Sequence, residues 1–265
     1  MQQKKIVVIG GGAGTDMLLA GLKRYTSKLS ALISPFDAAS AQWPVVSDHY
    51  VSSLLALGAD PSTTRLMERL FDYHLTREQG SQAGPDSFQS TFGNLFLSAL
   101  TGITGTPDQA LQAAAQVLNV RGQVLPITLH ECPLVAELGD GSEAMVTTPV
   151  GLIATSAKTG LRGIRLARPT PLLEAAADAI IQADVVVLGP ADFYFHVLAP
   201  FLLDGMAEAL AASSAVKVFV CNLLTQPNTT AGWPASHFAR QLISGGRGSG
   251  VGGRALLTTP DARTG

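Results

Sequence analysis

Six residues near the start of the chain, Gly10, Gly11, Gly12, Ala13, Gly14 and Thr15, have the composition of an anion-binding turn. The apolar run 6–9 precedes them and an apolar stretch to residue 22 follows, so the turn joins a predicted strand to a predicted helix. Glycines permit positive φ and close backbone approach, and the first turn of a helix offers free N–H groups and a positive dipole end. The spacing lacks the third glycine of the dinucleotide fingerprint and the Gly-Lys-Ser/Thr of a P-loop. We therefore predict a phosphate or nucleotide site, with a ligand-free tight turn as the alternative.

Other polar residues follow predicted strands, and ligands of open α/β sheets bind beyond the carboxyl ends of the strands. Asp37 follows the second strand, where it could bind a ribose hydroxyl or a metal, or lie in solvent. A turn with the sequence Gly-Pro-Ala-Asp follows the fourth strand. An amide, a hydroxyl and a second amide follow the fifth, and these side chains suit hydrogen bonds to a base or sugar. The candidates in the last two loops are Gly189, Pro190, Asn222, Thr225, Gln226 and Pro227.

Three further kinds of residue could take part in chemistry. Asn94 opens an apolar helix and either faces the pocket or caps that helix. Arg121 is the cation we expect near the pocket, with a surface ion pair as the alternative. The five histidines show no metal-ligand spacing, and no serine or cysteine has the context of a nucleophile elbow. We therefore predict binding through backbone and amide groups rather than nucleophilic catalysis.

Apolar runs that alternate with helical segments must position these residues. Strands are predicted at 5–9, 29–34, 124–129, 184–188 and 217–221, and helices at 15–23, 63–73, 93–103, 107–118, 171–182 and 204–212. Thr106 and Thr170, each followed by proline, are predicted N-caps. Alternating residues around Gly139-Asp140-Gly141 predict an antiparallel hairpin. The fold class is α/β: a three-layer, doubly wound, mostly parallel Rossmann-like sheet with an appended hairpin.

We predict one domain over 1–244, with the hairpin insertion at about 130–166. The segment 245–265 is rich in glycine and is predicted to be a solvated tail, with an RNA-binding Arg/Gly segment as the alternative.

Composition excludes several classes of protein. The 265 residues are 46% hydrophobic and 14% charged, which is typical of a globular protein, and the net charge of −2 gives no reason to expect nucleic-acid binding. The longest apolar stretch, 193–203, is too short to span a membrane, so we expect no membrane insertion. The two cysteines have no CxxC spacing and the N-terminus leads directly into a strand, so we predict a cytoplasmic protein without a signal peptide. Self-association is left open.

Taken together, five segments resemble the CofD-like family, which includes bacterial gluconeogenesis factors and 2-phospho-L-lactate transferases. The matching segments are 7–27, 90–105, 117–129, 185–210 and 218–238, and the sequences VRGQVLP and CNLLTQP are the most specific. The resemblance covers most of the chain and is stronger to the gluconeogenesis factors. It implies a nucleotide or nucleotide-sugar ligand of the UDP-sugar type and a role in carbon metabolism and cell shape.

The chain departs from the family pattern where phosphate and metal are expected. The paired aspartates, glycines and arginine that family members carry after the second strand are reduced here to Asp37, and the next family segment keeps Asp48. The resemblance implies Mg²⁺ as a cofactor, with these two aspartates as candidate ligands. Asp192 stands where small residues are usual, so it is either a further metal ligand or a sign of an altered phosphate site.

Three functions follow from these observations. A nucleotide-binding regulatory protein is the leading hypothesis, because the residues for the family's transfer chemistry are depleted. The second is a Mg²⁺-dependent transferase that uses a guanosine diphosphate donor, with Asp37, Asp48 and Asp192 as metal ligands. The third is a homologue that acts by protein contact through an apolar surface such as residues 193–201.

Overall fold

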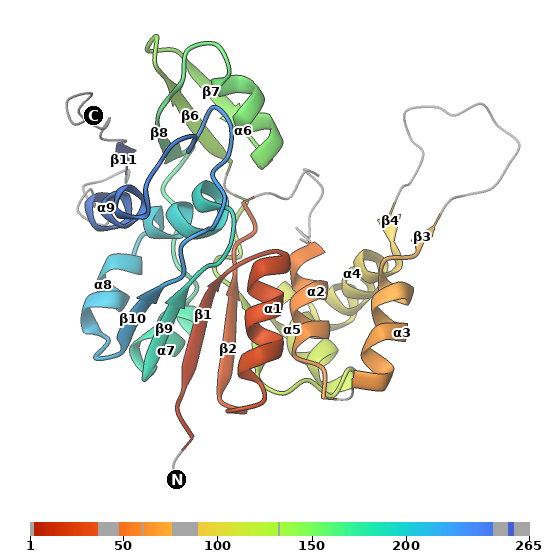
Figure 1. The fold of residues 1–265 in the computed structure, drawn as a ribbon. Coiled ribbons are helices and arrows are strands. Elements are labelled where there is room, and N and C mark those ends of the chain that lie inside the picture. The colour runs from red at the N-terminus through yellow and green to blue at the C-terminus, as the bar shows by residue number, and fades with distance from the viewer. Residues whose placement is uncertain are drawn as a thin grey trace, which may run out of the picture.

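A parallel sheet of five strands forms the centre of the molecule (Figure 1). The structure is a computed structural model that describes residues 3–36, 48–59, 61–75, 90–131, 133–245 and 254–256. The strand order is β10-β9-β1-β2-β5, and every neighbouring pair is parallel. The strands are β1 (Ile6–Gly10), β2 (Leu29–Ile33), β5 (Gln123–Pro126), β9 (Val185–Leu188) and β10 (Val216–Phe219). All five predicted strands are confirmed. A short apolar run between helices can bury its side chains on both faces of a sheet by forming a strand in the middle layer.

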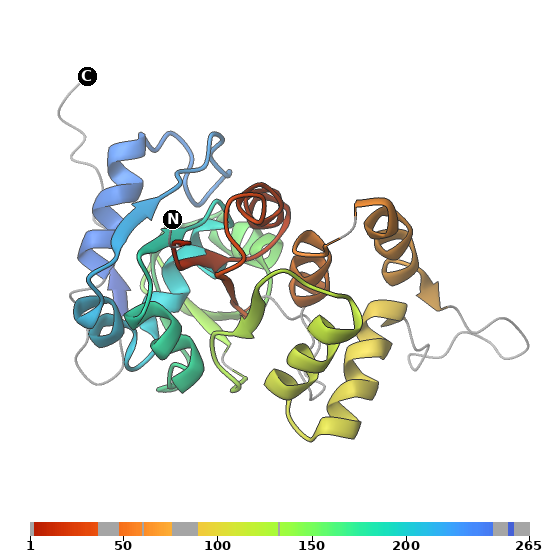
Figure 2. The same ribbon diagram turned by 90° about the horizontal axis from the view of Figure 1, so that it is seen from below.

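Helices cover the two faces of this sheet and form two separate cores (Figure 2). One core contains buried residues of α1 (Ala13–Leu22), α2 (Asp48–Ala56), α4 (Phe92–Thr104) and α5 (Pro107–Val117), and α3 (Pro61–Phe71) packs beside α2 and α4. The other contains residues of α7 (Glu174–Ile181), α8 (Met206–Ala212) and α9 (Ala235–Gly245). The doubly wound prediction is therefore confirmed.

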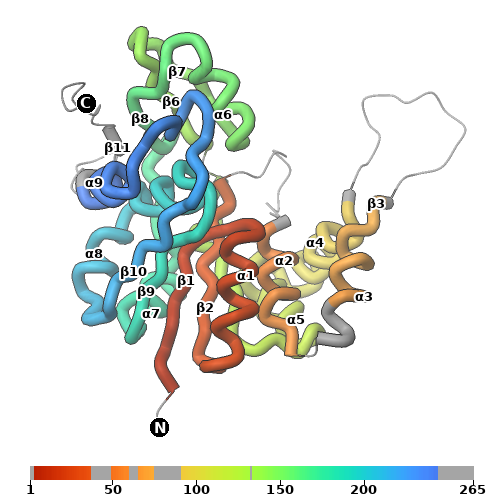
Figure 3. The backbone as a smooth tube through the Cα atoms, viewed as in Figure 1, coloured from red at the N-terminus to blue at the C-terminus, as the bar shows by residue number. Residues whose placement is uncertain are grey.

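A second, antiparallel sheet lies beyond the carboxyl ends of the parallel strands (Figure 3). Its order is β11-β8-β6-β7, from strands β6 (Leu134–Leu138), β7 (Glu143–Val146), β8 (Leu161–Leu166) and β11 (Arg254–Leu256), and α6 (Pro149–Ser156) connects β7 to β8. The predicted hairpin is confirmed as β6 and β7. The sequence analysis missed β8, whose alternating arginines and glycine gave no clear apolar run.

Several predictions of local structure are wrong. Within the predicted solvated tail, Arg254–Leu256 form β11 and pair with β8, because backbone pairing does not depend on the glycine content around it. Thr170 does not cap a helix: its hydroxyl donates to the Arg168 carbonyl, and α7 begins later, after Leu173. Thr106 does occupy the N-cap position of α5. A short pair, β3 (His74–Leu75) and β4 (Ser90–Thr91), was also missed.

The segment that we considered as an apolar contact surface is interior. Residues Phe193–Leu198 form a π-helix, η1, and Ala199–Leu202 a 3-10 helix, η2. Every side chain of η1 is buried, so the third hypothesis loses its proposed surface. No helix among the described residues combines the length and the apolar character needed to cross a bilayer.

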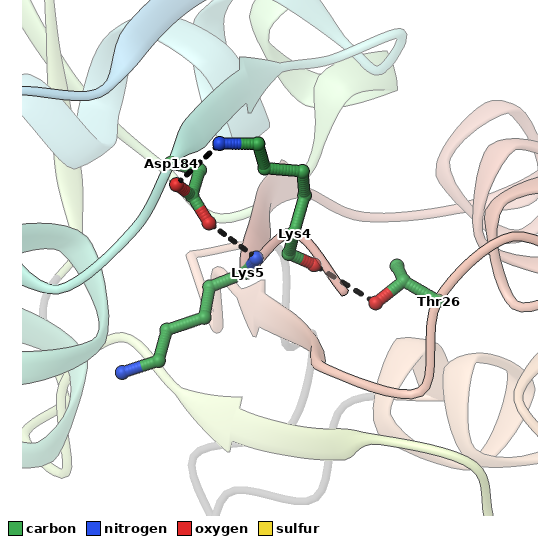
Figure 4. Close-up of polar contacts among 4 residues, drawn as sticks. All are labelled: Lys4, Lys5, Thr26 and Asp184. Atoms are coloured by element: carbon green, nitrogen blue, oxygen red, sulfur yellow. Dashed lines mark hydrogen bonds and ion pairs between the residues drawn. The ribbon is translucent and has the colours of Figure 1, made fainter. Parts of the chain in front are cut away.

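Hydrogen bonds hold the amino end of β1 between its two neighbours (Figure 4). The Lys5 amide donates to Asp184 Oδ2 at 2.8 Å, and the Lys4 ammonium lies 3.0 Å from Asp184 Oδ1. On the other side, the Thr26 hydroxyl donates to the Lys4 carbonyl at 2.8 Å. The bond from the Lys5 amide and the Lys4 side chain lower the pKa of Asp184. These contacts fix the amino end of β1 relative to its two neighbours, and the carboxyl end of β1 leads into the glycine turn.

Candidate functional site

The predicted glycine turn, residues 10–15, lies between the carboxyl end of β1 and the first turn of α1, and we call it the glycine corner. Gly12 is the N-cap of α1, with φ 81° and ψ −177°, a conformation that residues with a Cβ rarely adopt. No side chain caps the helix here, and Ala13, its first residue, is exposed. The corner therefore presents helix N–H groups where an anion could approach.

The other glycines of the corner are explained by contacts within the protein. A Cβ built on Gly10 would lie 2.3 Å from Thr15 Oγ1, and one on Gly14 would lie 2.8 Å from the Pro190 carbonyl oxygen. A Cβ on Gly11 would lie 2.8 Å from His196 Nδ1. The close approach that these glycines permit is thus to other groups of the protein, namely Thr15 of the same turn, His196 of η1 and Pro190 of the loop after β9.

The β9 loop is bound to the glycine corner by hydrogen bonds. The Gly189 amide donates to the Ile9 carbonyl at 2.8 Å, and the peptide bond before Pro190 is cis. Thr15 Oγ1 accepts from the Gly11 amide at 2.9 Å and lies within donating distance, 3.1 Å, of the Pro190 carbonyl oxygen. The structure therefore brings these predicted residues together: Gly10, Gly11, Gly12, Gly14, Thr15, Gly189 and Pro190.

The loop after β10 is held against the β9 loop. Asn222 Nδ2 donates to the Ala191 carbonyl at 2.8 Å, and Gln226 Nε2 donates to Asp192 Oδ2 at 2.9 Å. Thr225 and Pro227 are exposed, and so are Leu223 and Leu224, which stand between Asn222 and Thr225. The amides of Asn222 and Gln226, which we predicted to bind a ligand, thus bind a neighbouring loop.

Asp192 is a helix cap. Its Oδ1 accepts from the Tyr194 amide at 3.0 Å and from the Phe195 amide at 2.9 Å, at the start of η1. With Oδ2 occupied by Gln226, both carboxylate oxygens have partners within the protein. The interpretation of Asp192 as a metal ligand does not fit this arrangement.

The remaining candidates are placed as follows. Asn94 does not cap α4: Thr91 is the N-cap, and its hydroxyl accepts from the Asn94 amide at 3.2 Å. Asp48 is the first residue of α2, but its side chain, like the whole of Asp37, lies outside the described part of the structure. Within that part, no three His, Cys, Asp or Glu residues form a group that could hold a metal.

Arg121 is not near the pocket. It precedes β5, so it lies toward the amino ends of the parallel strands, and its amide donates to the Leu57 carbonyl at 2.9 Å. Burial lowers the pKa of Lys23, just beyond the last turn of α1, and the charge of Arg121 lowers it further. The prediction failed because the VRG segment, residues 120–122, leads into the amino end of β5, whereas ligands of such sheets bind beyond the carboxyl ends of the strands.

Two histidines that the sequence analysis set aside meet at the glycine corner. The rings of His49, on α2, and His196, on η1, have centroids 4.9 Å apart and an edge-to-face angle of 82°. His196 is buried, whereas a Cβ built on Gly12 would lie 3.4 Å from His49 Cε1. The imidazoles therefore line the corner from two elements far apart in the sequence, which spacing along the chain could not have indicated.

Asp16, in the first turn of α1, faces α2 beside this pair. Its Oδ1 accepts from the Ser53 hydroxyl at 2.8 Å. Burial raises the pKa of Asp16, while hydrogen bonds from Ser52 and Ser53 and the charge of His49 oppose that rise. The corner is thus polar on the α2 side, with a carboxylate that is costly to ionise.

Comparisons with known proteins agree with this architecture. Residues 6–255 match the family described as "2-phospho-L-lactate transferase CofD". The chain is 36% identical over 244 residues to a putative gluconeogenesis factor of Nostoc sp., covering 90% of this chain and 51% of that protein. It is 34% identical to a putative gluconeogenesis factor of Thermoanaerobacterium thermosulfurigenes, covering 88% of this chain and 71% of that protein.

A solved structure extends the comparison to the fold. A crystal structure of a UPF0052 family member from Bacillus halodurans is 30% identical to this chain, with a TM-score of 0.77. The match covers 95% of this chain and 79% of that one. The chain therefore spans about half of the Nostoc relative, and 71% and 79% of the other two proteins.

Proposed function

Because the chain belongs to the CofD family, we propose that it is a nucleotide-binding regulatory protein of the gluconeogenesis factor type. The ligand class is a nucleotide or a nucleotide-sugar such as a UDP-sugar, with its phosphates at the glycine corner. The role we assign is cytoplasmic and concerns carbon metabolism and cell-envelope growth; the name of the relatives, gluconeogenesis factor, supports the part that concerns carbon metabolism.

One observation carries the proposal: α1 begins at Gly12 with positive φ and without a side-chain cap. A helix N-terminus without a capping side chain can receive an anion. The helix α8 also begins in this way, at Gly205, but only α1 of these two follows the carboxyl end of a parallel strand, where ligands of such sheets bind. His49 lies against Gly12 and would border the bound phosphates. The loops after β9 and β10 would complete the site through their backbone and through exposed Thr225.

The experiment places a carboxylate where the phosphate should bind. Ala13 is exposed at the first position of α1, so Ala13→Asp favours the helix dipole and should leave the free energy of unfolding unchanged or raise it by about 0.3–1 kcal/mol. The same carboxylate repels phosphate, and we expect affinity for a UDP-sugar to fall about tenfold or more. Ala13→Asn is the neutral control and should retain binding.

Binding is measured by calorimetry with UDP-N-acetylglucosamine, UDP-glucose, GDP and GTP, each with and without Mg²⁺. Magnesium-independent binding of a UDP-sugar that Ala13→Asp weakens and Ala13→Asn does not would support the proposal. Equal affinities for both variants would place the phosphates elsewhere, and no binding by the unaltered chain would refute the proposal.

A magnesium-dependent transferase that uses a GDP-linked donor is the second candidate. Asp48 immediately precedes His49 at the start of α2, and this position favours a metal close to the corner. Mg²⁺ supplies charge neutralisation on phosphates in such transfers. On this hypothesis, Asp48→Asn and Asp37→Asn each abolish magnesium-dependent turnover of a GDP-linked donor, and unchanged turnover in both would exclude it.

A further inference from the structure

A cleft of about 690 Å³ opens between three helices on one face of the molecule, and we call it the helical cleft. Helices α1, α2 and α3 lie side by side in that order (Figure 1), with α2 as the floor and the other two as walls. The volume lies in the range of about 300–1,000 Å³ that is typical of small-molecule sites. The cleft begins at Asp16, the residue that follows the glycine corner.

The floor and the inner walls of the cleft are apolar. Val51 and Leu55 contribute from α2, Met17 and Ala20 from α1, and Phe71 from the end of α3. Met17 is 77% exposed. A ligand with an aliphatic body would remove the Met17 side chain from water and would lie against Val51, Leu55 and Phe71, which are already buried.

Carboxylates stand on both walls. Asp16 lines the cleft from α1, and Glu68 and Asp72 line it from α3. Among the described residues, no ion pair joins any of the three to a cation. The ammonium of the nearby Lys23 acts on Glu68 only at longer range and donates to the Gly58 carbonyl at 2.7 Å. His74 also lines the cleft, so three carboxylates stand there against one imidazole, and this balance favours a cation over phosphate.

We propose that the helical cleft binds an aliphatic diamine or polyamine, with its methylene chain on the α2 floor and its amino groups at the carboxylates of α1 and α3. One end of such a ligand would meet Asp16 and the other would meet Glu68 and Asp72. This site is separate from the proposed nucleotide site. Its ligand would carry positive charge, whereas a nucleotide carries negative charge.

Calorimetric titration of the full chain with putrescine, cadaverine and spermidine tests the proposal. The unaltered chain should bind at least one of them, whereas 1,5-pentanediol, which has the aliphatic chain without the charges, should not bind. The double variant Glu68→Gln/Asp72→Asn should weaken binding about tenfold, and Asp16→Asn should weaken it several-fold. The control double variant Asp178→Asn/Glu208→Gln removes the same charge from exposed positions outside the cleft and should leave the affinity unchanged.

Circular dichroism and the melting temperature establish that each variant is folded. Because the side chains of Glu68 and Asp72 are exposed, we expect their substitution to weaken amine binding without lowering the melting temperature. Absence of amine binding by the unaltered chain would overturn the proposal. So would equal weakening by the control pair, since the binding would then reflect net charge. Nucleotide titrations of the same variants keep the two proposals separate, because amine binding can fail while nucleotide binding persists.

Discussion

The glycine corner and the helical cleft share helix α1, yet their polar side chains differ in what they contact. At the corner, candidate ligand-binding groups bind one another: Thr15 contacts Pro190, and Gln226 binds Asp192. In the cleft, Glu68 and Asp72 face an open volume and have no ion pair among the described residues. Polar residues that follow strands thus serve largely to hold loops, whereas Glu68 and Asp72 face the open cleft.

This difference indicates how the corner could bind an anion although its amides and carboxylate are already engaged. Loops that are fixed by mutual hydrogen bonds keep the N-terminus of α1 in place, so binding need not order them. What remains for a ligand is the backbone at Gly12 and Ala13, which the His49 ring borders. The predictions below test whether the corner is as rigid as its contacts imply.

Gly11→Ala should have the largest effect. The added Cβ would lie 2.8 Å from His196 Nδ1, and His196 is too deeply buried to move aside. We expect the free energy of unfolding to fall by about 1–3 kcal/mol, measured by urea denaturation. Gly21→Ala is the control: no atom lies within 4 Å of its added Cβ, and it should stabilise α1 by about 0.5–1 kcal/mol. Equal effects of the two substitutions would contradict the tight packing of the corner.

Asp192→Ala should come next, because it removes the cap of η1 and the bond to Gln226 together. Loss of an N-cap costs about 0.5–2 kcal/mol, and we expect a value in the upper part of that range by urea denaturation. Asp192→Asn keeps an oxygen acceptor and should lose less. If Asp192→Ala left stability unchanged but lowered the affinity for Mg²⁺, Asp192 would instead be a metal ligand.

The sequence predicted the central sheet well because its strands are apolar runs that need burial on both faces. It missed α2, although Ser47 and Asp48 directly before the apolar run are a usual helix-start signal. The cap formed by Asp192 was detectable in principle, since an aspartate immediately before an apolar helical run is typical of an N-cap. The family pattern directed attention to the unusual charge of Asp192 instead.

The contents of the site were harder to predict than the fold. Gly11 was correctly placed in the turn, but its neighbour His196 lies far along the chain, and only the packing of η1 against β1 brings them together. The same holds for the pair of His49 and His196. Asp16 was overlooked because a carboxylate in the first helical turn is ordinarily explained by the helix dipole.

Tyr194→Phe should have a smaller effect than the loss of the Asp192 cap. The Tyr194 hydroxyl is buried, donates to the Thr229 carbonyl at 3.3 Å and ties η1 to the loop after β10. Burial also raises the pKa of this hydroxyl, so it remains a donor at any ordinary pH. Removing it should cost about 1 kcal/mol in a thermal or urea unfolding experiment. Tyr25→Phe, at an exposed tyrosine, is the matched control and should change stability little.

The smallest expected effects are two pH dependences of opposite sign. Burial raises the pKa of Asp16, so its contribution to stability is full below the unfolded value of 3.8 and is lost as the pH rises through the folded pKa. Hydrogen bonds from Lys5 and Lys4 lower the pKa of Asp184, so its contribution is present above 3.8 and is lost as the pH falls through the folded pKa. Urea unfolding between pH 3 and pH 7 should therefore show the unaltered chain losing stability relative to Asp16→Asn as the pH rises, and relative to Asp184→Asn as the pH falls. If the curve for Asp16→Asn ran parallel to that of the unaltered chain, burial would not perturb Asp16, and the helical cleft would then lack the partly buried carboxylate at its α1 wall.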